Sequence, residues 1–161
     1  MIMLDVDAFR RIVETAAFHQ FIGLKLDRAD DVAGLVVLRL PYNPALSIFP
    51  DAGVYHGGVI AALIDVAGAV ACGLKTGRPT PTANFRVDFL KSPAKIDLIA
   101  TGRLVRAGKA LSVADVEISD DKGEVYAVGR GTFSTTASFK AISAGAASAL
   151  TGNPPTAGTE N

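Results

Sequence analysis

The residues best suited to chemistry stand together between His56 and Gly73, a stretch that holds one charge, Asp65, among apolar and small residues. His56 is followed by Gly57 and Gly58, and Asp65 comes nine residues after the histidine. A carboxylate in apolar surroundings is costly unless it reaches water, accepts hydrogen bonds or takes part in a reaction. The residues alone therefore leave two roles open for Asp65, a reacting group or a satisfied partner of a nearby backbone group or cation.

This stretch is predicted to form a helix with two different faces. Bulky residues recur at helical spacing and should pack on a sheet: Val59, Ile60, Leu63, Ile64, Val66 and Val70. The residues three, four and seven positions from Asp65 are small, so another group can approach that face closely: Gly58, Ala61, Ala62, Gly68, Ala69 and Cys72. A transmembrane span is a poorer interpretation, because the uncharged runs beside Asp65 are shorter than the roughly 20 apolar residues a bilayer requires.

The start of the helix supplies hydrogen-bond donors. The first N–H groups of a helix lack internal partners and carry a partial positive charge, so those at Gly57 and Gly58 could hold an anion or a polarised carbonyl oxygen. At about 1.5 Å per residue, Gly57 lies about 12 Å from Asp65 along the helix, too far for both to touch one reacting group. A second chain packed antiparallel across the small-residue face would bring the two together, so we expect a dimer.

Composition argues against several classes of function. The chain has 161 residues, enough for one domain with a real core, and its 16 basic and 16 acidic residues balance without a basic run, which speaks against nucleic-acid binding. The single cysteine, Cys72, is expected to be a buried hydrophobe, and the two histidines show no metal-binding spacing, so no metal or cofactor is predicted. His19 is interpreted as a surface or capping histidine. The N-terminus lacks the pattern of a signal peptide, so we expect a cytoplasmic protein.

The rest of the chain alternates helix, strand and turn signals. A first helix capped by Asp5 or Asp7 should end near Gly23, and a long loop should run from Pro41 to Tyr55. Strands are expected at residues 23–27, 32–40, 82–89, 96–106, 109–119 and 124–135, with a turn at 28–31. The strand at 82–89 should bury one face: Ala83, Phe85, Val87 and Phe89. Residues 1–137 are predicted to be a single α+β domain, with an antiparallel sheet around one central helix, and residues 138–161 a disordered tail rich in Ala, Gly, Ser, Thr and Pro.

From about Phe21 to Ser134 the chain resembles the hotdog-fold acyl-CoA thioesterases, in particular the PaaI-like type of the phenylacetate pathway. The resemblance rests on GVYHGG at 53–58 with Asp65 at its spacing, TANFRVDFLKSPA at 82–94, Gly108-Lys109, and GEVYAVGRGTF at 123–133. It implies a hotdog fold and a homodimer with a continuous sheet, often paired into a homotetramer. It also implies an acyl-CoA substrate that is hydrolysed to free acid and CoA. From the charge balance and the short apolar runs described above, we expect no nucleic acid and no membrane as partner.

The resemblance also implies roles for particular residues. Asp65 would be the catalytic carboxylate, acting as nucleophile or as general base, and the Gly57 N–H of the neighbouring subunit would polarise the thioester carbonyl. His56 would shape the same loop, and Thr82 matches a position where the family often carries a hydroxyl beside the carboxylate. The residues expected to contact the CoA moiety are Gly58, Lys91, Arg106 and Lys109.

One position departs from the family pattern. Six residues before His56 the family usually has an Asn or Gln whose amide helps to hold water or thioester, whereas this chain has Pro50, which offers no side-chain donor. Water could then be held by another residue, with Asp51 a candidate. The departure favours one alternative, a hotdog protein that binds acyl-CoA as a sensor or assembly subunit without hydrolysing it. A hydratase or dehydratase of the same fold is a weaker alternative.

Overall fold

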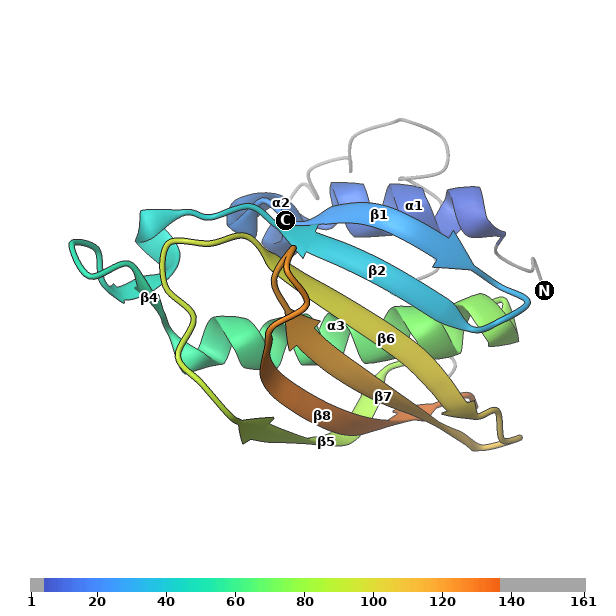
Figure 1. Ribbon diagram of the computed structural model, residues 1–161. Helices are drawn as coiled ribbons and strands as arrows, with labels where there is room; N and C mark the ends of the chain where they lie inside the picture. The colour runs from blue at the N-terminus through green and yellow to red at the C-terminus, as the bar shows by residue number, and fades with distance from the viewer. Residues whose placement is uncertain (1–4, 137–161) are drawn as a thin grey trace, which may run out of the picture.

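The computed structural model describes residues 5–136 and consists of an antiparallel sheet that curves around one long helix (Figure 1). The elements in chain order are α1 (Val6–Thr15), α2 (Ala17–Ile22), β1 (Lys25–Asp30), β2 (Leu35–Leu40), η1 (Pro44–Leu46), β3 (Ser47–Phe49), β4 (Val54–Tyr55), α3 (Gly57–Thr76), β5 (Thr82–Phe89), β6 (Leu98–Arg106), β7 (Leu111–Ser119) and β8 (Val125–Ser134). The six-stranded sheet has the order β1-β2-β6-β7-β8-β5, and β3 pairs with β4. The predicted α+β class is confirmed. The tail predicted at 138–161 lies outside the described residues.

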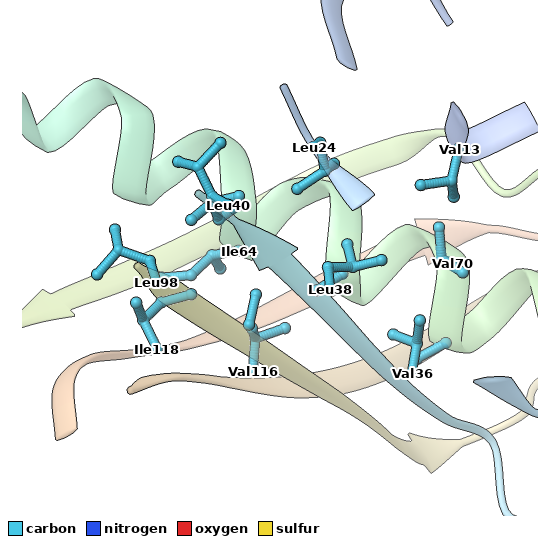
Figure 2. Packing of buried hydrophobic residues seen from close by; sticks show 14 of the residues in the cluster. Val13, Leu24, Val36, Leu38, Leu40, Ile64, Val70, Leu98, Val116 and Ile118 are labelled. Carbon is cyan, nitrogen blue, oxygen red and sulfur yellow. The ribbon is translucent and has the colours of Figure 1, made fainter. Parts of the chain in front are cut away.

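The core lies between α3 and the concave face of the sheet. Figure 2 shows Leu38, Leu98, Val116 and Ile64 pointing into the same layer from β2, β6, β7 and α3. By length and composition α3 could also cross a membrane, but the core helix of a folded domain passes the same test, and the sheet covers this one. The predicted bulky face of α3 is confirmed at Ile60, Leu63, Ile64 and Val70, which are buried.

Two glycines allow α3 and the sheet to approach closely. A methyl group added at Gly102 on β6 would lie 2.5 Å from the carbonyl oxygen of Ala67, and one added at Gly68 would lie 2.5 Å from the ring of Phe133 on β8. Gly68 is therefore buried under the sheet, as is Cys72, so these two residues do not belong to the open face on which the sequence placed them. The small residues that remain partly exposed beside Asp65 are Ala61, Ala62 and Ala69.

β5 lies at an edge of the sheet and pairs only with β8. The prediction that this strand buries one face was wrong for the single chain, because Phe85 is 39% exposed and Phe89 is 56% exposed. No other element of the described chain covers this edge. β5 thus presents unpaired backbone groups and large apolar side chains together, which is the usual condition of a strand that another chain can extend.

The bounds of several elements differ from the prediction, and the expected first helix is divided at Ala16 into α1 and α2. Residues 28–30 of the expected turn are part of β1, which continues to Asp30 through an irregular register between Leu26 and Arg28, and the turn itself begins at Asp31. The extra residue of such a bulge shifts the alternation of side chains between the two faces of the strand, so the sequence of β1 lacks the regular apolar–polar alternation by which a strand is predicted. The predicted loop at 41–55 contains η1 and the short β3–β4 hairpin. This hairpin leads directly into His56 and the start of α3.

Candidate active site

Asp65 and Thr82 are brought together by the return of the chain from α3 into β5. The Thr82 hydroxyl donates a hydrogen bond to Oδ1 of Asp65 over 2.5 Å. Short O–H···O⁻ contacts of this kind are typical of charge-assisted hydrogen bonds. Asp65 is half-buried and Thr82 is exposed, so the carboxylate keeps access to a ligand while one of its oxygens is fixed.

His56 caps the start of α3 with its side chain. Nδ1 of His56 accepts a hydrogen bond from the Gly58 N–H over 2.9 Å, and the His56 carbonyl accepts one from Val59 N–H, also over 2.9 Å. Because Nδ1 acts as acceptor, the proton of the neutral ring lies on Nε2, where it is a donor. The Gly58 N–H, which could have donated a hydrogen bond to the CoA moiety, therefore already has an acceptor inside the chain.

The Gly57 N–H is the free donor at this helix start. Within residues 5–136 no protein acceptor lies in hydrogen-bonding range of it, as expected for the first residue of a helix. Its amide dipole adds to the positive end of the 20-residue α3. Gly57 can therefore donate to a carbonyl oxygen or an anion without giving up a contact inside the described chain.

Within one chain the Gly57 N–H and the Asp65 carboxylate lie far apart. Thr82, at the first residue of β5, contacts Asp65, whereas Phe89, at the last residue of β5, lies beside Gly57. α3 is a continuous helix, so the estimate of about 12 Å between Gly57 and Asp65 stands. Two half-sites thus occupy opposite ends of β5, one with a carboxylate and one with a donor.

His19 has a setting that the sequence did not reveal. It is half-buried on α2, and its Nδ1 lies 3.0 Å from the Val13 carbonyl oxygen, which can only accept and therefore fixes the proton on Nδ1. Burial lowers the pKa of His19, against the weaker raising effects of this hydrogen bond and of the negative charge of Asp65. Burial thus disfavours the charged form of His19, and the charge of Asp65 partly opposes this lowering of its pKa. No spacing in the sequence indicates this, because the two residues belong to separate elements.

The cations predicted for CoA do not gather in one chain. Lys91 lies just beyond the Phe89 end of β5 and forms an ion pair with Glu124, whereas Arg106 and Lys109 are exposed near the opposite end of the sheet. Pro50 lies in the exposed turn of the β3–β4 hairpin, where the Gly53 N–H donates to the Phe49 carbonyl. Among the described residues no group of acidic, histidine or cysteine side chains could hold a metal ion.

Comparison with known proteins identifies the family. A family model described as the thioesterase superfamily matches residues 52–127. A Halobacterium salinarum protein with a provisional esterase name is 36% identical over 134 residues, which cover 75% of this chain and 85% of the relative. The chain belongs to the thioesterase superfamily. Within it, the Escherichia coli medium/long-chain acyl-CoA thioesterase YigI is 31% identical over 124 residues, 65% of this chain and 76% of YigI.

Solved thioesterase-superfamily structures have the same fold. A Shewanella oneidensis protein related to the superfamily matches with a TM-score of 0.73 and 25% identity over 80% of this chain and 94% of its own. The Escherichia coli PaaI protein of the phenylacetic acid degradation operon matches with a TM-score of 0.67 and 25% identity, covering 80% of this chain and 95% of PaaI. The predicted hotdog fold and the resemblance to PaaI-like thioesterases are confirmed.

Proposed function

We propose that this member of the thioesterase superfamily hydrolyses an acyl-CoA thioester to a free acid and CoA. The observation that carries the proposal is the Asp65 carboxylate, held at 2.5 Å by the Thr82 hydroxyl on a face of small residues. A purely structural carboxylate would be expected to be covered by the fold, whereas Asp65 is only half-buried. Asp65 is thus accessible, and the match to the acyl-CoA thioesterase YigI supports a thioester as the group it meets.

The complete site is proposed to form between two subunits through β5. Antiparallel addition of a second β5 at the open edge would reverse the strand, so that the Thr82 end of one chain meets the Phe89 end of the other. Asp65 would then face Gly57 of the partner subunit. The same operation would carry Lys91 of one chain to the end of the sheet that holds Arg106 and Lys109 of the other, where the phosphates of CoA could be bound.

In the proposed reaction the thioester carbonyl oxygen accepts a hydrogen bond from Gly57 N–H of the partner subunit, which stabilises the negative charge that develops there. Asp65 either removes a proton from a water molecule that attacks the carbonyl carbon, or attacks the carbon itself and forms an anhydride that water then opens. In both routes the C–S bond breaks and CoA leaves as a thiolate, which takes its proton from the protonated Asp65 in the first route and from water in the second. The Thr82 hydroxyl holds one oxygen of Asp65 so that the other can react.

The experiment that tests the proposal is the release of free CoA from aromatic and aliphatic acyl-CoAs, detected with a thiol reagent. The protein adds little background, because its single cysteine, Cys72, is fully buried and burial raises the pKa of its thiol to about 12. Asp65→Asn keeps the size of the side chain and an oxygen for Thr82 but removes the charge. We expect wild type to turn over and the variant to lose about 10²- to 10⁴-fold in rate.

Mixing two inactive variants tests whether the site is shared. A heterodimer of an Asp65→Asn chain with a Gly57→Pro chain contains one site with two altered residues and one site that is wild type at both positions. Random re-association should therefore restore about a quarter of wild-type activity. A mixture that stays inactive after subunit exchange has been verified would show that Asp65 and Gly57 do not act across the subunits.

Pro50 favours one alternative, a protein that binds acyl-CoA without consuming it. Its side chain cannot donate a hydrogen bond, so the hairpin turn lacks the amide that the family pattern places there. A binder should retain intact acyl-CoA in equilibrium dialysis, with no free acid after prolonged incubation. Hydrolysis by wild type that depends on Asp65 would reject this alternative.

A further inference from the structure

We infer that Phe89 is a further residue of this site, which shields the Gly57 donor from water and so strengthens its hydrogen bond to the reacting carbonyl. The inference rests on the proposed function. A methyl group added at Gly57 would lie 3.4 Å from Cζ and 3.5 Å from Cε1 of Phe89. The tip of the Phe89 ring therefore lies beside Gly57, at ordinary contact distance from its Cβ position.

The fold itself does not explain the position of this ring. Phe89 is 56% exposed and does not belong to the buried core. A phenylalanine placed outside the core contributes only part of the stabilisation that full burial would supply. Its position beside Gly57 at the start of α3 is the feature that distinguishes it from the other exposed apolar residues.

Phe89 is held firmly where it stands. It pairs with Ala127 on β8, and the N–H groups of the next two residues, Leu90 and Lys91, both donate to the Tyr126 carbonyl over 2.9 and 3.1 Å. The end of β5 is thus fixed to β8 by backbone hydrogen bonds. The ring lies on a rigid element, as a group that shapes a reaction site must.

Water exclusion gives the contact a chemical effect. The neighbours of Gly57 at the helix start, His56 and Gly58, are exposed. Apart from these chain neighbours and the backbone of the first turns of α3, Phe89 supplies the only atoms of the described residues within 4 Å of the added methyl position. A donor beside an apolar wall competes less with water and acts in a lower local dielectric, so it stabilises a developing oxyanion more strongly. Phe89 would therefore contribute mainly to kcat.

The test compares Phe89→Ala with Leu90→Ala, two truncations of adjacent residues that are 56% and 57% exposed. We expect Phe89→Ala to lower kcat by about tenfold or more, below the hundred- to thousandfold cost of removing a donor, with a smaller change in KM. Leu90→Ala should stay within about twofold of wild type, and Phe89→Tyr, which keeps the ring, should retain most activity. The melting temperature and the oligomer mass should be the same for all the variants.

A double-variant cycle isolates the action through Gly57. In a Gly57→Pro background the donor is absent, so adding Phe89→Ala should cause little further loss of kcat. Equal losses in both backgrounds, or an equal loss in Leu90→Ala, would overturn the inference. Unchanged kcat in Phe89→Ala while wild type releases CoA would overturn this inference and leave the proposed function standing, whereas no release by wild type would overturn both.

Discussion

Replacement of Gly57 by proline should remove one catalytic group and leave the fold intact. Proline lacks an N–H and is favoured at the first position of a helix, which is where Gly57 stands. The preceding residue, His56, already has the extended conformation that a following proline requires, with φ −66° and ψ 134°. The added ring carbon at the Cβ position would meet Phe89 at 3.4 Å, an ordinary contact.

The expected magnitudes for Gly57→Pro separate activity from stability. No hydrogen bond of Gly57 N–H within residues 5–136 is lost, and the reduced freedom of the unfolded chain should stabilise the variant by about 0.4–1 kcal/mol. Loss of an oxyanion donor should lower kcat by about 10²- to 10³-fold, or about 2.7–4 kcal/mol of transition-state stabilisation. We therefore expect an unchanged or slightly raised melting temperature beside a near-complete loss of CoA release.

The assay pairs thermal melting with steady-state CoA release at saturating acyl-CoA. Gly57→Ala serves as the comparison, because alanine keeps the N–H and introduces the same Cβ contact with Phe89, and it should lose far less activity than the proline variant. A folded Gly57→Pro protein that retains kcat within tenfold of wild type would refute the role of this N–H. A variant that fails to fold would refute the account of the helix start.

Three further results are expected. Thr82→Val, which cannot hydrogen-bond to Asp65, should lose about 10- to 100-fold in kcat, whereas Thr82→Ser should recover most of it. Gly102→Ala should lower the free energy of unfolding by about 1–3 kcal/mol in urea titrations, because the new methyl meets the Ala67 carbonyl oxygen, a backbone atom, at 2.5 Å. Burial raises the pKa of Tyr126 from 10.0 to about 12, so its contribution to stability is complete below about pH 10 and is lost as the pH rises to about 12. Between pH 8 and 12 the melting temperature should thus fall less steeply with pH for Tyr126→Phe than for wild type. Identical slopes for the two proteins would contradict the raised pKa of Tyr126.

The elements with a clear period were predictable from the sequence. The central helix was expected from His56 to Gly73 and runs from Gly57 to Thr76, and the strand at 82–89 has the predicted bounds. The pairing of that strand with β8 was not predictable, because pairing depends on how the whole sheet closes and not on local pattern. The exposure of Phe85 and Phe89 was missed for the same reason, since alternation indicates an apolar face but not what covers it.

The candidate site was predictable in its members but not in its arrangement. The carboxylate and the helix start followed from residue type and spacing, and Thr82 followed from the family resemblance. Three features were not predictable from the sequence: the Nδ1 cap of His56 on Gly58, the link between His19 and Asp65, and the ring of Phe89 beside Gly57. The first depends on the orientation of one side chain, and the other two join residues from separate elements, so none of the three is encoded in the period of a single element.

The placement of the two half-sites at opposite ends of β5 has a consequence for how activity scales with amount. In a single chain Asp65 lacks a Gly57 N–H opposite it, and Gly57 lacks an Asp65. On the proposed arrangement a single chain therefore has no activity. Specific activity would then rise with enzyme concentration and fall on dilution below the dissociation constant of the pair. A newly synthesised chain would be inactive until it associated with a second copy. The rate measured at each dilution would then report the fraction of the protein that is dimeric.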